Sequence, residues 1–525
     1  MTAAESGWTL PSATARGKAL LRDLEQLGVK ASCDPADLWA MSRDCWPRAL
    51  LWTKAGVAPH PPDVVAWPAD VGQVAAVVKF AVERQVAVVP FGGGSGLCGG
   101  AVPVRGGIAL DLKRLTGPLR IDLAARTVEV GAGLNGQRLE EMLQAQGATL
   151  GHFPSSLYCS TVGGWLATRA AGQLSARYGK IEDMVLSVEA VDGTGAILRT
   201  LDGPSAGPDL TQLLVGNEGT LGVITGARLR IWPKPSRQWL RGVRFSSVPK
   251  GLRALRTVMR SGLRPAVARL SDPFETLLEG SSGPQVPQPL KWVVEGAQAE
   301  ALRMALRAPL LLNRLVEALP ASSLLVLGFE GDSEDECAEE GAAALELCEA
   351  EDGEDLGPAP GERWLMNRYR SGYRQSPLFS AGAFVDTLEV ATTWDRLEAL
   401  DRGVRHAVDG LAFVHGQFSH AYPEGCAIDF TLIGLAGAPA EKIARGPRDD
   451  AELDLEEAES RYDACWKAAL SAAADAGATL SHHHGIGIAR QIMLPREHGE
   501  GMRQLRALKK AFDPHGILNP GKLLL

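Results

Sequence analysis

Apolar and polar residues alternate in the first half of the chain in a way that predicts helices and strands in turn. Apolar residues recur at helical spacing over residues 14–28 and again over residues 71–85. Short β-branched runs over residues 63–68 and 86–90 flank the second of these helices. Residues 63–90 are therefore predicted to form a β–α–β unit.

The same pattern continues to about residue 232 and stops at the proline-rich residues 233–235. Further strands are expected over residues 107–112, 126–130, 185–192, 197–200 and 227–232, and helices over residues 135–146 and 209–216. Residues 151–183 lack periodicity, and a long loop punctuated by glycine is expected there.

A second region begins near residue 240. Strands are expected over residues 242–245, 265–271 and 324–329, helices over residues 250–261 and 333–350, a polar loop over residues 281–289, and a mostly helical section over residues 453–512.

Composition narrows the class of protein. A chain of 525 residues is too long for one hydrophobic core. Its net charge of -8 gives no general attraction to nucleic acid. The eight cysteines are scattered without a CxxC pair, which disfavours zinc ribbons, and we find no secretory leader and no apolar run of roughly 20 residues. We therefore expect reduced thiols and a cytoplasmic protein, associated with a membrane surface if its substrate is a lipid.

A dense glycine cluster over residues 90–100 follows a predicted strand. Glycines expose backbone N–H groups that can converge on an anion. The cluster is neither a Walker loop nor G-x-G-x-x-G. Taken alone, it fits a mobile turn and a phosphate-binding loop equally well.

Two further segments, residues 152–172 and 216–224, are rich in glycine and small polar residues. Long irregular segments inside compact domains are often functional. Three such turns in one domain of βα units predict a cradle for a planar cofactor that carries phosphate.

The motifs over residues 160–165, 168–172, 178–183, 216–224 and 329–332 resemble those of one flavoprotein superfamily. It is the FAD-binding, PCMH-type superfamily of vanillyl-alcohol oxidase and p-cresol methylhydroxylase. Within it, the chain is most similar to the alkylglycerone-phosphate synthase family, also called alkyldihydroxyacetone-phosphate synthase. The resemblance covers about residues 60–525 and is weaker over residues 240–450.

The resemblance implies a noncovalently bound FAD, with its pyrophosphate at the amides of residues 92–97 and its ring system against residues 154–172. The implied cofactor-binding residues are Pro90, Gly92, Gly93, Gly94, Ser95, Gly96, Leu97, Pro154, Ser155, Ser156, Ser160, Thr161, Gly163, Gly164, Thr168, Arg169, Ala170, Gly172, Tyr178, Glu218, Gly219, Gly222 and Ile224. The hydroxyls of Ser160, Thr161 and Thr168 are candidates for hydrogen bonds to the flavin. Alternatively, these hydroxyls only cap turns.

Three consecutive histidines, His482, His483 and His484, precede Gly485. On an extended segment, adjacent side chains point to opposite faces, which disfavours a metal site made by all three. No metal is therefore expected. The resemblance places the triplet beside the flavin, and the alternation favours His484 and then His482 as the residues that face the site.

Arg269 matches an arginine that the family requires for activity, and its guanidinium suits a phosphate or a carboxylate. The alternative is a salt bridge to Asp272 or Glu275. A second phosphate-binding arginine of the family falls near Arg374, where our alignment places Gln375 in the matching column.

The chain departs from the family at Asp429, where the family has a catalytic tyrosine. A phenol and a carboxylate are different acid–base groups. Asp429 could act as a base if burial raised its pKa, or it could bind a cationic or hydroxylated substrate. His420 is a candidate substrate-binding residue.

Two functions follow from the resemblance. The first is the redox-neutral exchange of an acyl group for a fatty alcohol on acylated dihydroxyacetone phosphate, with Arg269 and the histidine triplet holding the phosphate. The second is an FAD-dependent dehydrogenase or oxidase of 2-hydroxy acids such as D-lactate or glycolate, with His484 or His420 as the base. The Gly-Asp-Gly-Asn-x-His motif of such dehydrogenases is missing, which favours the synthase. A divalent metal held by His420 and Asp429 and a flavin-binding protein without activity are weaker alternatives.

The expected fold class is α+β. A helical N-terminal lead (1–59) precedes a two-subdomain, PCMH-type FAD-binding domain (60–235). An α/β cap domain for the substrate (236–452) and a helical C-terminal section that completes the flavin site (453–525) follow. The expected partner is a small-molecule or lipid substrate bearing phosphate or carboxylate. The expected assembly is a homodimer.

Overall fold

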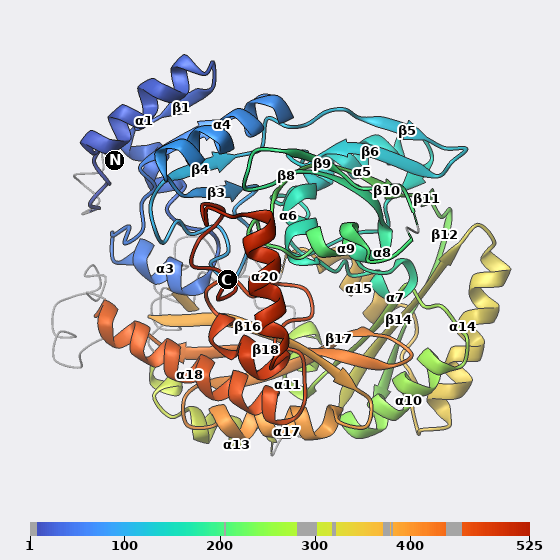
Figure 1. The fold of residues 1–525 in the computed structure, drawn as a ribbon. Coiled ribbons are helices and arrows are strands. Elements are labelled where there is room, and N and C mark those ends of the chain that lie inside the picture. The colour runs from blue at the N-terminus through green and yellow to red at the C-terminus, as the bar shows by residue number, and fades with distance from the viewer. Residues whose placement is uncertain are drawn as a thin grey trace, which may run out of the picture. The chain divides into compact units, whose positions relative to one another are not determined.

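The computed structural model describes residues 8–203, 206–280, 302–317, 322–370, 378–379, 382–436 and 454–525 (Figure 1). The chain divides into two compact units. Unit 1 contains Met1–Gly172, Gly179–Lys234 and His483–Leu525. Unit 2 contains Gln173–Tyr178 and Pro235–His482. Secondary structure is mixed, as the predicted α+β class requires. The loop predicted over residues 281–289 lies outside the described residues.

Unit 1 contains a small sheet in the order β1-β2-β4-β3. Strands β2 (Val64–Trp67) and β3 (Val88–Phe91) both pair in parallel with β4 (Ile108–Asp111), which lies between them. Strand β1 (Lys30–Ser32) adds to β2 in antiparallel fashion. Apart from the partly buried Trp67, the apolar side chains of β2 and β4 are almost fully buried, as expected for parallel strands covered on both faces.

Two amphipathic helices cover this sheet. Helix α1 (Ala15–Gln26) is capped by the Thr14 hydroxyl, and α4 (Val71–Arg84) by the Asp70 carboxylate. Both helices lie beside the strands in Figure 1. Their apolar side chains and those of the strands form one buried cluster. The helices predicted over residues 14–28 and 71–85 and the β–α–β unit are confirmed. The lead also contains α2 (Pro35–Ala40) and α3 (Pro47–Lys54).

A second sheet of unit 1 is antiparallel and has the order β5-β6-β10-β8-β9. Its strands are β5 (Arg120–Asp122), β6 (Thr127–Gly131), β8 (Val185–Val191), β9 (Ile197–Arg199) and β10 (Val223–Arg230). A separate strand pair joins β7 (Ala148–Thr149) to β11 (Trp232–Pro233). The predicted helices appear as α5 (Gly136–Gln144), capped by Asn135, and α9 (Leu210–Leu214).

The prediction that residues 151–183 form a continuous loop is wrong. This stretch contains α6 (Val162–Thr168), α7 (Ser175–Tyr178) and α8 (Ile181–Met184). Gly163 and Gly164 hide the helical signal of α6 because glycine is a poor helix former. The Thr161 hydroxyl caps α6, and the buried side chains of Trp165 and Leu166 anchor it.

The end of the chain belongs to unit 1. A 3₁₀ turn, η3 (Gln491–Met493), precedes α19 (Leu494–His498) and α20 (Gly501–Phe512). The backbone then forms a bridge at Val88 in β3, which donates to the carbonyl of Ile517 and accepts from the amide of Asn519. The C-terminal residues therefore border the strand that leads into the glycine cluster.

Unit 2 is built on one seven-stranded antiparallel sheet with the order β15-β12-β14-β13-β17-β18-β16 (Figure 1). Its strands are β12 (Arg237–Phe245), β13 (Val267–Ser271), β14 (Ser323–Gly331), β15 (Glu354–Asp355), β16 (Ala383–Thr393), β17 (Phe413–Ala421) and β18 (Gly425–Leu435). Its longer helices are α10 (Val248–Arg260), α11 (Pro273–Gly280), α13 (Pro309–Glu317), α14 (Glu334–Glu349), α15 (Ala359–Asn367), α17 (Leu397–Val408) and α18 (Leu455–Asp475).

The two faces of this sheet differ along β16, β17 and β18. Leu388, Phe430 and Phe418 are fully buried on one face, where α18 and α17 pack. Register brings Glu389, Asp429 and Gln417 into one row on the opposite face. This polar row is the chemical feature of unit 2.

No helix among the described residues is long and apolar enough to cross a membrane.

Candidate cofactor and substrate site

The glycine cluster begins directly after β3, and its chain is pressed against residues 159–161. A Cβ built at Gly92 would meet the Thr161 hydroxyl, and one built at Gly93 would overlap the carbonyl oxygen of Cys159. Within the described residues, none of the hydrogen bonds is donated by an amide of residues 92–97. Because backbone donors are nearly always paired, this run of amides is suited to bind an anion.

The hydroxyls of residues 160–168 form bonds inside unit 1. Ser160 Oγ accepts from Trp165 Nε1 at 2.8 Å and donates to the Ser156 carbonyl at 2.8 Å. Thr161 caps α6, and Thr168 Oγ1 donates to the Gly164 carbonyl at 3.1 Å. These contacts match the alternative in which the hydroxyls cap turns and shape the loop.

Arg169 has a left-handed backbone with φ 54°. Its guanidinium donates to the Gln212 carbonyl at 2.8 Å and lies 3.8 Å from Glu182. The structure therefore gives Arg169 a role in fixing the segment that follows α6. Gly172 is pressed against the amide of Phe153, where a Cβ would not fit.

Glu218 organises the third glycine-rich turn. It is buried, has a left-handed φ of 49°, and is followed by Gly219 with φ 76°. Its carboxylate accepts from the amides of Ile486 at 2.6 Å and Gly487 at 2.8 Å. Burial raises the pKa of Glu218 to about 7, and the two amide bonds oppose that rise.

Two buried charged residues that the sequence did not single out lie in the same unit. Asp44 accepts from the amides of Trp46 and Ala101, and burial raises its pKa to about 6. Lys522 donates to the Val102 carbonyl at 2.7 Å, and burial lowers its pKa to about 8. No local motif marks either residue, because the contacts that bury them join distant parts of the chain: Ala101 for Asp44 and Val102 for Lys522.

The histidine segment bends instead of running extended. The rings of His483 and His484 contact each other, with centroids 4.4 Å apart. The prediction of an extended segment with side chains on alternate faces is therefore wrong. His483 and His484 belong to unit 1, and His482 belongs to unit 2.

Arg269 lies on β13, on the same face of the sheet as the polar row. Its guanidinium donates to Gln417 Oε1 and lies 5.9 Å from the ring centre of Trp364. The alternative salt bridges do not form: Asp272 pairs with Arg405 at 3.0 Å, and Glu275 pairs with His415 at 2.9 Å. Arg269 is thus oriented by a neutral amide and an aromatic ring.

Asp429 lies between Gln417 of β17 and Glu389 of β16 in the register of the sheet. Directly opposed residues have Cβ atoms about 4.5–5.5 Å apart. Asp429 is therefore placed beside a second carboxylate, Glu389. On the β17 side, Ser271 of β13 is the residue opposite Gln417, and Arg269, two residues earlier, contacts the row through its bond to Gln417. Glu389 was missed because it lies within a strongly apolar strand.

His420 is buried in unit 2 among polar and aromatic side chains. Its Nδ1 is 3.2 Å from Ser175 Oγ, which is also 3.1 Å from the Tyr422 hydroxyl. Its ring stacks on His482 with centroids 5.2 Å apart. The structure thus brings together His420 and His482, two of the predicted site residues.

The predicted cofactor-binding residues lie almost entirely in one unit. All predicted cofactor-binding residues lie in unit 1 except Tyr178, which lies in unit 2 and donates its hydroxyl to Glu330. A contact inside unit 2 therefore accounts for Tyr178. Arg374 lies outside the described residues.

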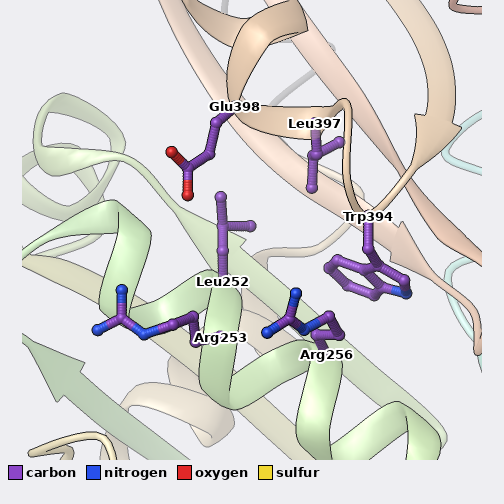
Figure 2. A pocket seen from close by; sticks show the side chains of 6 residues that line it. All are labelled: Leu252, Arg253, Arg256, Trp394, Leu397 and Glu398. Carbon is purple, nitrogen blue, oxygen red and sulfur yellow. The ribbon is translucent and has the colours of Figure 1, made fainter.

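A small pocket of unit 2 lies elsewhere on that unit (Figure 2). It is lined by Leu252, Arg253, Arg256, Trp394, Leu397 and Glu398, none of which is a predicted site residue. Arg253 is paired with Glu351 at 2.8 Å.

The residues of unit 1 fit an FAD. The amides of residues 92–97 are available for a pyrophosphate, and Gly92, Gly93 and Gly172 occupy positions that cannot hold a side chain. When bound, FAD would supply a redox-active, electrophilic ring, and the described residues around it would supply shape and hydrogen bonds.

Two family models match the chain: an FAD binding domain over residues 62–201, and the C-terminal domain of FAD linked oxidases over residues 234–523. An alkyldihydroxyacetonephosphate synthase of Trypanosoma brucei brucei is 29% identical over 489 residues, which are 90% of this chain and 75% of that protein. A D-lactate dehydrogenase of Archaeoglobus fulgidus is 28% identical over 470 residues, which are 88% of this chain and 91% of that protein. A solved alkyldihydroxyacetonephosphate synthase structure superposes with a TM-score of 0.75 at 24% identity, covering 98% of this chain and 87% of the other.

Proposed function

Since the chain belongs to the FAD-linked oxidase family and is an FAD-dependent enzyme, we propose that it binds FAD noncovalently and exchanges acyl for alkyl on a phosphate-bearing substrate. The proposed reaction is that of an alkyldihydroxyacetonephosphate synthase, in which a fatty alcohol replaces an acyl group without net electron transfer. The resemblance to that family supports noncovalent binding. Denaturation by acid should then release all of the flavin into solution.

The observation that carries this proposal is the state of Arg269. Its guanidinium faces the polar side of the sheet, and both candidate carboxylate partners, Asp272 and Glu275, are engaged by other basic residues. The Gln417 amide and the Trp364 indole orient this guanidinium, whose planar set of N–H donors suits a phosphate. This arrangement suits a substrate with an anionic head group.

In the proposed reaction, His420 and His482 act as the proton-handling groups of unit 2. Ser175 orients the His420 ring through Nδ1, and the His420 ring supports His482 by stacking. Asp429 takes the place of the family's tyrosine and provides a carboxylate opposite Glu389, which accepts from the His482 amide. Proton transfer between alcohol, carboxylate and imidazole requires no electron acceptor.

The test is incorporation of labelled fatty alcohol. Purified holoenzyme is given an acylated dihydroxyacetone phosphate and a labelled long-chain alcohol. The proposal expects label in a phosphate-bearing ether product, with one fatty acid released per ether formed. Release of fatty acid without alcohol incorporation would contradict it.

A second candidate function is oxidation of a 2-hydroxy acid. Asp429 favours it, because a carboxylate replaces the tyrosine of the synthases. For this function Arg269 would bind the substrate carboxylate and His420 would take the hydroxyl proton. Bound FAD would supply the acceptor for the hydride of the α-carbon, so that the products are a 2-oxo acid and reduced flavin. Mixing the oxidised holoenzyme with D-lactate or glycolate in the absence of oxygen should then bleach the visible flavin band. A band that persists excludes this function for those substrates.

A further inference from the structure

Two buried glutamates hold the histidine segment, which we define as residues 481–487. We propose that Glu389 and Glu218 are positioning residues, each of which fixes the part of this segment that lies in its own unit. Glu389 thereby sets the backbone that carries the His482 imidazole, and Glu218 sets the backbone that follows His483 and His484. The inference deepens the proposed function, because it concerns how the proton-handling histidines are held.

Glu389 holds the beginning of the segment within unit 2. It lies on β16 and is fully buried. Its Oε1 accepts from Ser481 Oγ at 2.8 Å, and its Oε2 accepts from the His482 amide at 2.6 Å. Burying a carboxylate costs free energy unless hydrogen-bond donors satisfy its oxygens, and these two bonds offset that cost.

Glu218 holds the end of the segment within unit 1. Each oxygen accepts one amide: Oε1 takes that of Ile486, and Oε2 takes that of Gly487. Asn519 Nδ2 donates to the Glu218 carbonyl at 2.7 Å, which fixes the backbone of the glutamate. Glu218 keeps its left-handed conformation although glycine would adopt it more easily, and such outliers are frequent at functional sites.

The backbone between these anchors has little freedom to adjust. Gly485 has φ 81° and lies so close to Glu218 Oε1 that a Cβ would not fit. Gly487 has φ 52°, and a Cβ there would overlap the Cys98 carbonyl, which accepts from the amides of Ile488 and Ala489. Because the backbone of residues 485–487 is held within unit 1, few conformations remain for His483 and His484, which precede it in the same unit.

Glutamine is the informative replacement at both positions. It keeps the size and shape of glutamate but presents an NH₂ group where the second donor needs an acceptor. At Glu218, one of the two amides must lose its partner. At Glu389, either Ser481 or His482 must lose its partner. Each variant therefore loosens one end of the segment and leaves the other end intact.

The first measurement is amide hydrogen exchange of the holoprotein, resolved to residues 480–490. Glu389→Gln is expected to speed exchange at His482 at least tenfold and to leave Ile486 and Gly487 unchanged. Glu218→Gln is expected to do the reverse. Exposed Glu398→Gln, in the pocket of Figure 2, is the matched control and should change neither end. Unchanged exchange in both variants would overturn the proposal.

The second measurement distinguishes positioning from mere stabilisation. The midpoint potential of the bound flavin is measured for each variant that retains wild-type FAD content. Displaced imidazoles are expected to shift this potential beyond the spread of replicate wild-type titrations, with the control unmoved. Faster exchange with an unshifted potential in both variants would overturn the positioning role.

Milder variants keep the test usable if glutamine prevents folding. Ser481→Ala removes one donor to Glu389, and Glu218→Asp shortens the reach to the two amides. The same exchange pattern and shifted potential are expected from them. Neither measurement needs the organic substrate, so failure of alcohol exchange, with these shifts present, would count against the proposed reaction alone.

Discussion

Gly93 is the residue at which the cofactor loop has least room. A Cβ there would overlap the Cys159 carbonyl, and backbone cannot move aside as a flexible side chain can. Gly93→Ala is therefore expected to destabilise the protein by about 1–3 kcal/mol and to lower FAD occupancy. Thermal unfolding and flavin content per chain measure both effects.

Gly96→Ala provides the stability control within the same loop. The nearest atom to a Cβ at Gly96 is an oxygen of Asp44 at 3.5 Å, an ordinary contact. Its melting temperature should stay within the error of the wild type. Equal destabilisation by the two alanine substitutions would show that Gly93 is not in close contact with the backbone of Cys159.

Arg269 depends on its planar group for orientation. Lysine keeps the charge but cannot use Gln417 and the Trp364 ring in the same way. Arg269→Lys is expected to raise KM for the phosphate-bearing substrate at least tenfold, or about 1.4 kcal/mol, with a smaller change in kcat. Steady-state kinetics check this.

Arg256→Lys, in the pocket of Figure 2, is the matched control and should leave KM unchanged. If Arg269→Lys also behaves like the wild type, the anionic group of the substrate binds elsewhere.

At the scale of elements, α18 is attached to β16 through one buried carboxylate. Asp386 Oδ2 accepts from the Tyr462 hydroxyl at 2.5 Å and from Trp466 Nε1 at 2.8 Å. Tyr462→Phe removes one charge-assisted bond and should lower the free energy of unfolding by about 1.5–3 kcal/mol. Urea denaturation measures the change. Tyr158→Phe, at an exposed tyrosine, should lower the free energy of unfolding by less than about 0.5 kcal/mol. Equal losses in the two variants would show that the bond from Tyr462 to Asp386 does not stabilise the fold.

Hydrophobic periodicity predicts the helices and strands that have a regular apolar face in their own sequence. It misses elements whose stability depends on contacts with distant residues. Helix α4 and its neighbouring strands follow from β-branched runs and an Asp70 cap. Helix α6 was missed because its first turn contains two glycines, and its stability comes from Thr161 and a buried Trp165. Propensity alone cannot recover such a helix.

The residues of the candidate site also differ in whether the sequence alone reveals them. The glycine loop, Arg269 and the histidines are recognisable as residue types in motifs. Glu389 and Asp44 are not, because the bonds that define them join residues far apart in sequence. The bend of the histidine segment also escaped prediction, because its backbone is set by Glu218, more than 260 residues earlier in the chain.

Across the whole chain, residues from both the N-terminal and the C-terminal parts are buried in unit 1. Asp44 from the N-terminal lead and Lys522 from the C-terminus are both buried and interact electrostatically. Burial outweighs this attraction, since the pKa of Asp44 is raised to about 6 from 3.8. The folded state therefore binds a proton that the unfolded chain releases between about pH 4 and 6.

This linkage predicts a pH dependence of stability. The contribution of Asp44 is fully present below its unfolded pKa and is lost as pH rises through about 6. The stability of the wild type relative to Asp44→Asn should fall by about 2–3 kcal/mol between pH 4 and 7. Thermal or denaturant unfolding at four pH values checks it. A constant difference, or one that grows with pH, would show that Asp44 is not a buried raised-pKa carboxyl.

We propose that this FAD-dependent enzyme exchanges acyl for alkyl without net redox change. The most direct test follows labelled alcohol and the visible flavin band in one anaerobic reaction with acylated dihydroxyacetone phosphate. We expect label to accumulate in the phosphate-bearing product over many turnovers, with the flavin band recovered in full at the end and no electron acceptor consumed. Net flavin reduction without incorporation of label would contradict the claim.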